Sequence, residues 1–522
     1  MSFNFSKSKF VSVCTTCNKY AWLDRHRPND KKPIDEYTES LFDNGYKVGE
    51  LAKKYFNVNA DVTILNEFDE PNTTAMVIET KKQIAAGTKV IAEASFDFWG
   101  LFCSVDILVK NVDGSYNIYE IKSSKRKPKE ERQYDGVKEK YIIDAAYQQY
   151  VLEKLGYKVD KVYVVLLSET YVRGKTLELD KYFVSVDVTR FTTDMQTMVK
   201  DKLTEISAVL NQTQEPITKF NAKCKDCDYF TFCSRNVPSP SVFDIYEKTK
   251  PPKHELYNAG ISFFDAPKRA EKLCEAAKKQ IEYYNRPHDA YIDKVTIKEF
   301  LDSLSFPLYS LDFETYQAVV PEHEGMKVSE VVPFQYSLHV MKVPNGDYRE
   351  GSPDISESHF LDISDGDPRR SIAESLVRDI PYGASVIAYH ESTERSIINR
   401  LAELFPDLAD HLLSFGYTNS KGEKRFKDPL PLFKGGHYYT SLMGNKFSIK
   451  SVLPALYPND PEMDYHNLEG SVKNGTQAMI AITKAKEVSE EERNQIEEDL
   501  IKYCSLDTYA VVKIIEKLYE VI

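Results

Sequence analysis

Long apolar runs are missing from this sequence, and none approaches the roughly 20 residues that a membrane-spanning helix needs. The N-terminal stretch MSFNFSKSKFVSV also lacks the apolar centre and the cleavage site of a secretory signal peptide. These absences argue against a membrane protein and against a secreted one. We therefore expect a soluble protein that works in the cytoplasm and does not bind membranes.

A net positive charge is missing as well, since the formal charge of the chain is −12. This argues against a protein that coats nucleic acid with a basic surface. It does not exclude a nuclease, because a metal-dependent active site is acidic and its groove needs positive charge only locally. A local basic strip does occur after residue 122, where Lys125, Arg126 and Lys127 are candidate contacts for nucleic-acid phosphates.

What is present is enough apolar material for packed cores: 42% of the 522 residues are hydrophobic. A chain of this length is expected to hold more than one domain. Strand-like runs alternate with helix-like runs, which predicts an α/β fold. A stretch rich in proline and serine near residue 240, followed by a polar helix, predicts a helical linker over 241–300 between domains at 1–240 and 301–522.

Two short runs rich in β-branched residues, 105–109 and 119–122, are joined through Asn-Val-Asp-Gly and predict a β-hairpin. Glu120 and Lys122 are two residues apart and therefore share a strand face, with Asp106 nearby on the other strand. Two carboxylates can hold a divalent cation, and a lysine can position water or neutralise charge that develops on a phosphate. A solvated hairpin face is the alternative, and the adjacent basic strip favours the nuclease interpretation.

The run GLFCSVDILV, the motif YEIKSS and the helix-like AAYQQYVLEKLG together resemble the PD-(D/E)XK nuclease core of the RecB-like family. The resemblance implies a restriction-endonuclease-like fold, in which Asp106 and Glu120 bind Mg²⁺ or Mn²⁺. Lys122 would be the catalytic lysine and Gln148 the family's helix glutamine, although the usual Gln-x-x-x-Tyr is not kept because residue 152 is leucine. Glu93, in IAEASFDF, is the candidate for the additional upstream ligand.

Cysteine is sparse, with eight residues, and in a cytosolic chain these are metal ligands or core residues rather than disulfides. Cys224, Cys227 and Cys233 form C-x2-C-x5-C, which is a metal-ligand spacing, and need a fourth ligand. The N-terminal CTTCNKYAWL offers Cys17 or, alternatively, Cys14. One N-terminal cysteine plus this triad resembles the [4Fe–4S] staple of AddB-type and CRISPR-associated nucleases, which implies Cys17 as the fourth ligand. A four-cysteine Zn²⁺ site is the alternative.

The second domain has its own set of acids. An apolar strand, LYSLDFETY, carries Asp312 and Glu314 on one face, and Glu394 follows the strand ASVIAYH. Asp507 lies on the expected last helix with Tyr503 four residues earlier, on the same helix face. If the four acids converge, cations must neutralise them, and two metal ions could then clamp the attacking and leaving oxygens of a phosphodiester.

The segments DFET, YHESTE and YCSLDT resemble the DEDD exonucleases, a DnaQ-like superfamily with an RNase H-like fold that works from 3′ ends. The spacing of Tyr503 and Asp507 matches the tyrosine subtype, in which the tyrosine orients the attacking water. The family has aspartate in its middle motif, where this chain offers Glu394, with Asp428 as the alternative.

The order of the two segments resembles a bacterial family in which an iron–sulfur RecB-like nuclease is fused to a DEDD-type exonuclease. We therefore expect a metal-dependent nuclease that hydrolyses single-stranded DNA at two sites, in DNA repair, processing or defence. An RNA 3′ exonuclease with an N-terminal binding platform is one alternative, since nothing in the residues distinguishes the two nucleic acids. A non-catalytic scaffold that binds nucleic-acid ends is another.

Overall fold

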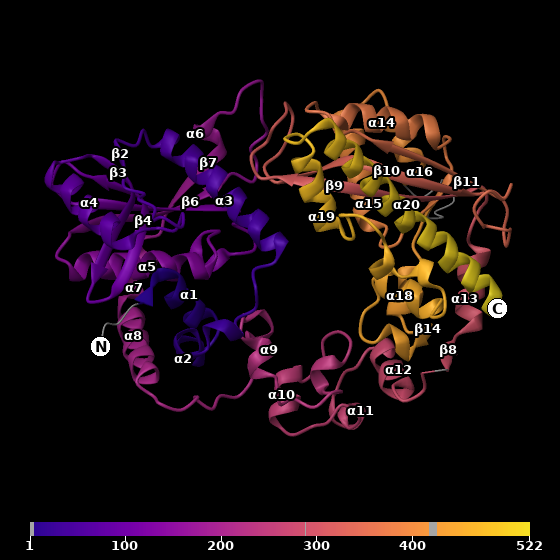
Figure 1. The fold of residues 1–522 in the computed structure, drawn as a ribbon, viewed down its shortest axis with the longest axis horizontal. Coiled ribbons are helices and arrows are strands. Elements are labelled where there is room, and N and C mark those ends of the chain that lie inside the picture. The colour runs from indigo at the N-terminus through magenta and orange to yellow at the C-terminus, as the bar shows by residue number, and fades with distance from the viewer. Residues whose placement is uncertain (1–4, 288, 417–424) are drawn as a thin grey trace. The chain divides into compact units, whose positions relative to one another are not determined.

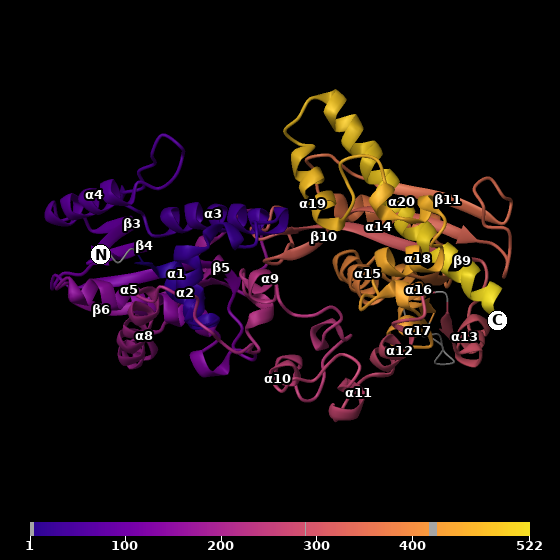
Figure 2. The ribbon, with the colours of Figure 1, turned by 60° about the horizontal axis from the view of Figure 1, so that its bottom comes forward.

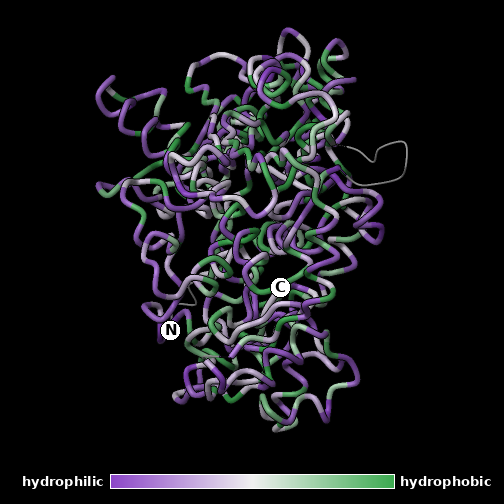
Figure 3. Tube along the Cα trace, turned by 90° about the vertical axis from the view of Figure 1, so that its right-hand side faces the viewer, coloured by the Kyte–Doolittle hydropathy of each residue, from purple (hydrophilic) through white to green (hydrophobic). Residues whose placement is uncertain are grey.

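The computed structural model describes residues 5–287, 289–416 and 425–522, and the chain divides into two compact units (Figure 1). Unit 1 comprises Met1–Asn236 and Ala318–Glu330, and unit 2 comprises Val237–Gln317 and Val331–Ile522. Both combine helices with a β-sheet, so the expected α/β class is confirmed. Hydrophobic stretches gather in the interior and hydrophilic stretches lie outside (Figure 3), as burial of apolar surface requires.

Unit 1 is built on a mixed sheet in the order β2-β3-β4-β5-β6-β7, with β1 beside β4. The strands are β1 (Phe5–Ser6), β2 (Ala60–Asp61), β3 (Val90–Phe98), β4 (Leu101–Lys110), β5 (Tyr116–Lys125), β6 (Val159–Leu167) and β7 (Phe183–Asp187). β4 and β5 form the expected antiparallel hairpin, whereas β5 and β6 are parallel. The two halves of β4 have different neighbours on this side. The second half of β4 pairs with β5, and its first residues pair with the parallel strand β1.

One central helix covers a face of this sheet. It is α5 (Glu139–Lys154), which contacts β3, β4, β5 and β6 and has ten buried residues. The surrounding helices are α1 (Lys7–Thr15), α2 (Lys19–His26), α7 (Thr189–Asp194) and α8 (Gln196–Leu210). The other helices of unit 1 are α3 (Glu36–Tyr55), α4 (Thr73–Ala85), α6 (Leu179–Tyr182) and α9 (Phe230–Cys233). The central position of α5 brings its polar side chains to the middle strands.

Unit 2 has a five-stranded sheet in the order β11-β10-β9-β12-β13. Its strands are β9 (Leu308–Ala318), β10 (Glu330–Met341), β11 (Ile355–Leu361), β12 (Ser385–Ile387) and β13 (Phe426–Lys427). A separate pair consists of β8 (Ala290–Ile292) and β14 (Tyr438–Thr440). The long helix α20 (Glu490–Val521) lies beside β9, β10 and β11 (Figure 2), and its Thr508 accepts a hydrogen bond from Ser310 of β9.

Among the described residues, six more helices belong to the second half of unit 2. They are α14 (Pro368–Asp379), α15 (Ser392–Leu404), α16 (Ala409–Gly416), α17 (Leu430–Lys434), α18 (Ile449–Leu456) and α19 (Gly475–Lys484). Residues 241–300, for which a linker was expected, hold α10 (Lys253–Asn258), α11 (Ala266–Arg269), α12 (Glu275–Tyr283) and the start of α13 (Lys294–Asp302). These residues belong to unit 2, because Ala276 and Ile297 are buried in its core.

Candidate active sites

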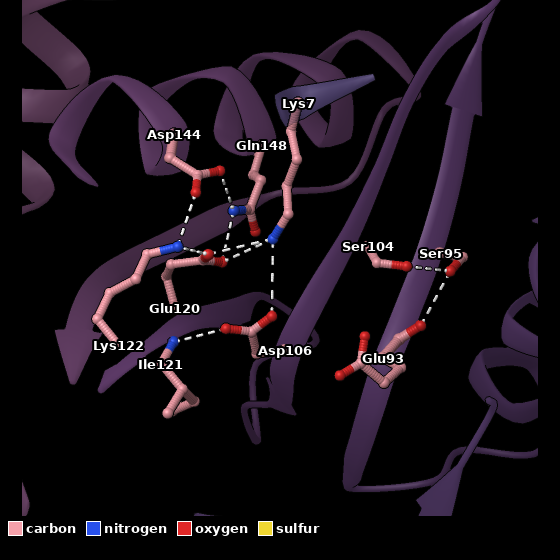
Figure 4. Close-up of polar contacts among 10 residues, drawn as sticks. All are labelled: Lys7, Glu93, Ser95, Ser104, Asp106, Glu120, Ile121, Lys122, Asp144 and Gln148. Carbon is pink, nitrogen blue, oxygen red and sulfur yellow. Dashed lines mark hydrogen bonds and ion pairs between the residues drawn. The ribbon is translucent and has the colours of Figure 1, made fainter. Parts of the chain in front are cut away.

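The first site lies between the β4–β5 hairpin and α5 (Figure 4). Asp106 comes from β4, Glu120 and Lys122 from β5, and Gln148 from α5. Alternation along β5 directs Glu120 and Lys122 to the same face, toward the helix. Asp144, one helical turn before Gln148, points to the same place, although the sequence analysis did not select it. Its position four residues before Gln148 on one apolar helix is the signal that could have identified it.

These side chains form one hydrogen-bonded network. Lys122 Nζ lies 2.5 Å from Glu120 Oε1 and 2.9 Å from Asp144 Oδ2. Gln148 Nε2 donates to Glu120 Oε2 at 2.6 Å and to Asp144 Oδ1 at 3.0 Å. Asp106 Oδ2 accepts from the backbone N–H of Ile121 at 2.7 Å, which ties the two strands together at the site. The structure therefore brings Asp106, Glu120, Lys122 and Gln148 together.

A second lysine, Lys7 at the start of α1, also enters this network. Its Nζ lies 3.1 Å from each oxygen of Glu120 and 3.6 Å from Asp106 Oδ1. Sequence reasoning did not find Lys7, because 113 residues separate it from Glu120 and no local pattern links the two.

Burial and like charge control protonation here. Glu120 is only 1% exposed, and burial together with Asp106 and Asp144 raises the pKa of Glu120 to about 7. Burial works against the charged form of Lys122, but Asp144 and Glu120 outweigh it and raise the pKa of Lys122 above its usual range. The lysine is therefore charged at neutral pH while Glu120 is near its titration point. A site in this state can exchange a proton for a cation.

Glu93 lies on β3 across from Asp106, since its neighbours Ala92 and Ala94 pair with Ile107 and Val105. Burial and Asp106 raise the pKa of Glu93 to about 8. Its backbone has φ +55°, which costs a non-glycine residue about 1–3 kcal/mol and is found preferentially at functional sites. The strand thus places Glu93 within electrostatic reach of the other acids.

The basic strip after Lys122 is only partly available for phosphates. Arg126 pairs with Asp135 at 2.6 Å and Lys127 pairs with Glu130 at 2.6 Å. Lys125 Nζ lies 3.4 Å from the carbonyl oxygen of Val328. Binding of a phosphate by Arg126 or Lys127 would have to compete with these partners.

Four cysteines form a separate neighbourhood. Cys17 lies between α1 and α2, Cys224 begins a short 3₁₀ helix (Cys224–Asp226) and Cys233 ends α9. Burial raises the pKa of Cys227 to about 11, and the thiols of Cys17, Cys233 and Cys224 add to this effect. The charges that act on Cys14 come instead from Lys202, Lys223 and Glu205. Cys17, and not Cys14, therefore interacts electrostatically with the cysteines of the C-x2-C-x5-C triad.

The spacing of these sulfurs bears on the kind of metal they could hold. Within the described parts of the chain, no three cysteine sulfurs lie within 4.8 Å of one another. A single Zn²⁺ with Zn–S bonds of about 2.3 Å holds its sulfurs closer than about 4.6 Å, whereas an iron–sulfur cluster distributes them over several irons. In the described parts of the chain the cysteine sulfurs are therefore not gathered closely enough for one Zn²⁺.

The second site lies in unit 2, where three elements contribute acids. Asp312 and Glu314 project from β9, Glu394 from the first turn of α15, and Asp507 from α20. Oxygens of Asp312 and Glu314 and the sulfur of Cys504 all lie within 4.8 Å of one another. Burial raises the pKa of Asp312 well above its usual value, and Asp507, Glu394 and Glu314 raise it further. The four acids expected to converge therefore do act on one another.

Tyr503, Tyr465 and Lys450 complete this site. Tyr465 Oη donates to Asp507 Oδ1 at 2.6 Å, and Lys450 Nζ donates to Tyr503 Oη at 2.9 Å. Burial raises the pKa of Tyr503 far above its usual value, so the hydroxyl keeps its proton. A cavity of about 130 Å³ is lined by Asp312, Asp507, Tyr503 and Lys450, among others. Lys450 is the second residue of α18 and Tyr465 begins a short 3₁₀ helix (Tyr465–Asn467). No local sequence pattern linked either residue to Tyr503 or Asp507.

The choice between Glu394 and Asp428 depends on hydrogen bonding. Both oxygens of Asp428 accept backbone N–H groups, from His390 and Leu430 on one and from Glu391 on the other. Glu394 is 4% exposed, and within the described residues its Oε2 has no hydrogen-bond partner. Burial, with Asp428 nearby, raises the pKa of Glu394 to about 8. Glu394 thus keeps one carboxyl oxygen without a hydrogen-bond partner among the described residues, whereas both oxygens of Asp428 accept hydrogen bonds.

Both sites have donor sets that suit hard divalent cations. Buried carboxylate pairs about 4 Å apart repel by about 4 kcal/mol at an effective dielectric near 20. An oxygen-ligated Mg²⁺ or Mn²⁺ would relieve this repulsion. The unpartnered Oε2 of Glu394, and the unpartnered Oε1 of Gln148 in the first site, show that neither network is complete within the described residues.

Part of unit 2 matches a known protein family. Residues 309–448 match a family described as Domain of unknown function (DUF2779), a span that contains Asp312, Glu314 and Glu394. No curated protein matches the chain at a significant level. Among the described residues, no helix is both long and apolar enough to span a membrane.

Proposed function

We propose that this chain is a metal-dependent nuclease that hydrolyses phosphodiester bonds at two sites. The observation that carries the proposal is the second site, where acids from β9, α15 and α20 act on one another beside a tyrosine and a lysine. Three of these acids, Glu314, Glu394 and Asp507, are buried. Without cations, the carboxylates of such a set repel one another and destabilise the fold. With cations, they would serve as ligands for the metal ions that promote phosphodiester hydrolysis. The first site adds a second set of acids with its own lysine.

Unit 1 would then be a PD-(D/E)XK nuclease domain and unit 2 an RNase H-like exonuclease domain. Support comes from the mixed sheet with α5 on one face in unit 1, and from D-x-E on β9 with Tyr-x-x-x-Asp on α20 in unit 2. Single-stranded DNA is the proposed substrate, because a narrow acidic site needs a strand that can be threaded into it. An RNA strand would contact the same carboxylates, so digestion of labelled DNA and RNA decides between the two substrates.

In the second site the chain's own residues have distinct tasks. Asp312, Glu314, Glu394 and Asp507 would hold Mg²⁺ or Mn²⁺, and the bound ions supply Lewis acidity for the phosphate and lower the pKa of water. Tyr465 fixes the orientation of the Asp507 carboxylate through its 2.6 Å hydrogen bond. Tyr503 keeps its proton and accepts a hydrogen bond from Lys450, and it would orient the attacking water.

In the first site Asp106, Glu120 and Glu93 would hold the ion. Lys122 is charged and partly buried beside Glu120, and it would position water or stabilise charge that develops on the phosphate oxygens. Gln148 holds Glu120 and Asp144 in position through one amide group.

The four cysteines are proposed to hold a [4Fe–4S] cluster, with Zn²⁺ as the competing occupant. Their sulfurs act on one another electrostatically but are more widely spaced than one Zn²⁺ requires. A cluster at this place would link residue 17 to residues 224–233 and so fasten the two ends of unit 1.

Chelation separates an enzyme from a scaffold. The protein is incubated with 3′-labelled single-stranded DNA and, separately, RNA, with Mn²⁺ or with EDTA. We expect cleavage of the DNA with Mn²⁺ and none with EDTA. Cleavage of RNA but not of DNA would show that the protein is an RNA exonuclease and would contradict the proposed DNA substrate. A labelled oligonucleotide that is retarded in a gel but never cleaved would contradict the enzymatic proposal.

A further inference from the structure

Lys7 occupies an unusual place for a lysine, because its segment is fastened to the centre of unit 1. Phe5 and Ser6 pair with Leu101 and Phe102 of β4 in parallel register. The carbonyl oxygen of Phe5 accepts a hydrogen bond from Tyr147 Oη of α5 at 2.7 Å. Lys7 follows directly as the first residue of α1, and its side chain is 18% exposed.

The ammonium of Lys7 faces the same oxygens that a cation would need. Of the two Asp106 oxygens, Oδ2 accepts the N–H of Ile121 and Oδ1 lies 3.6 Å from Lys7 Nζ. Both oxygens of Glu120 lie 3.1 Å from the same nitrogen (Figure 4). Lys7 Nζ therefore contacts the carboxylate oxygens that a divalent cation at this site would need.

The charges of the network agree with such a role. Asp106, Glu120 and Asp144 supply three carboxylates, and Lys7 and Lys122 supply two ammonium groups. Lys122 contacts Asp144 and one oxygen of Glu120, so it leaves the gap between Asp106 and Glu120 to Lys7. The two lysines therefore have different tasks.

We propose that Lys7 is a tethered cation that competes with the divalent metal for Asp106 and Glu120, so that loading of the first site requires the Lys7 side chain to withdraw. The inference rests on the proposed function, because it assumes that the first site binds a metal. If the inference holds, the N-terminal segment around β1 raises the concentration of divalent metal at which the first site becomes loaded.

The test measures Mn²⁺ binding by calorimetry in a background with Asp312→Asn and Asp507→Asn, which weakens the second site. Lys7→Met keeps the apolar stem and removes the charge, and Lys7→Arg keeps the charge. Lys9→Met is the control, since Lys9 is on the same helix but pairs with Asp24 at the surface. Melting curves of each variant show whether unit 1 is folded.

We expect Lys7→Met to bind Mn²⁺ about tenfold more tightly or better, because the repulsion of a nearby buried charge is removed. Lys7→Arg and Lys9→Met should bind as the parent does. Equal affinity for all four proteins would overturn the role of Lys7 alone, and weaker binding by Lys7→Met would make Lys7 a residue that supports the metal. No binding by any of them, including the parent, would overturn the proposed metal site itself.

Discussion

Replacement of Glu394 by glutamine should stabilise unit 2 in the absence of divalent cations. The folded-state pKa of this carboxyl is about 8, against a usual value of 4.5. An acid whose pKa is raised by folding destabilises the folded state as the pH rises from 4.5 to 8. At pH 7 the cost is about 3 kcal/mol, at 1.36 kcal/mol per pH unit over the interval from 4.5 to 7.

The assay is scanning calorimetry in EDTA at several pH values. Glu394→Gln should raise the melting temperature of unit 2 by about 6–12 °C at pH 7, and by much less at pH 5, where the cost falls to about 1 kcal/mol. Glu403→Gln is the matched control, because it lies on the same helix with its side chain 61% exposed. It should change stability by less than about 0.5 kcal/mol.

Saturating Mn²⁺ should stabilise the wild type more than the Glu394→Gln variant, because the variant lacks one of the proposed ligands. A variant that melts below the wild type at every pH would refute the reasoning, since Glu394 would then be a structural hydrogen-bonding group. A stabilisation independent of pH would refute it as well.

Three further predictions concern metal uptake, the cysteines and Lys450. Mn²⁺ binding to the first site should release protons and strengthen as the pH rises from about 6 to 8.5, because Glu120 and Glu93 have pKa values near 7 and 8 and bind protons below them. Calorimetry in two buffers of different ionisation enthalpy measures the release, and a pH-independent affinity would contradict it. Anaerobically purified protein should be brown and hold iron, with Cys17→Ser losing the visible absorption and Cys14→Ser keeping it; zinc in colourless wild-type protein would overturn the cluster. Lys450→Met should slow the trimming of 3′ ends at saturating oligonucleotide by about 10²-fold and leave substrate binding nearly unchanged, because it releases Tyr503, which is held at 2.9 Å. Single-turnover kinetics with a labelled oligonucleotide measures this step, and an unchanged rate would refute the role of Lys450.

Local patterns were sufficient for much of the first site. Alternation along the strand placed Glu120 and Lys122 on one face, and a turn motif placed Asp106 on the adjacent strand, where the structure has them. Gln148 was selected through the resemblance to the RecB-like family, and it lies on α5 (Glu139–Lys154). The alternation of side chains along a strand and the residue preferences of turns involve only a few neighbouring residues, so they can be recognised in the sequence.

Long-range contacts were not predictable in this way. Lys7 and Glu120 meet because a two-residue strand joins β4 where β5 has left it, and nothing near Lys7 signals this pairing. Lys450 and Tyr465 reach Tyr503 and Asp507 from loops and a short helix whose course depends on tertiary packing. The preference for Glu394 over Asp428 needed the hydrogen bonds that occupy Asp428.

The most direct test of the account is digestion of 5′- and 3′-labelled single-stranded DNA with Mn²⁺ by wild type, Lys122→Met and Asp507→Asn. We predict two separable activities: Lys122→Met keeps 3′ trimming and loses the other cleavage, and Asp507→Asn does the reverse. Unchanged 3′ trimming by Asp507→Asn, or full activity of both variants, would contradict the claim that these two carboxylate sites cut nucleic acid.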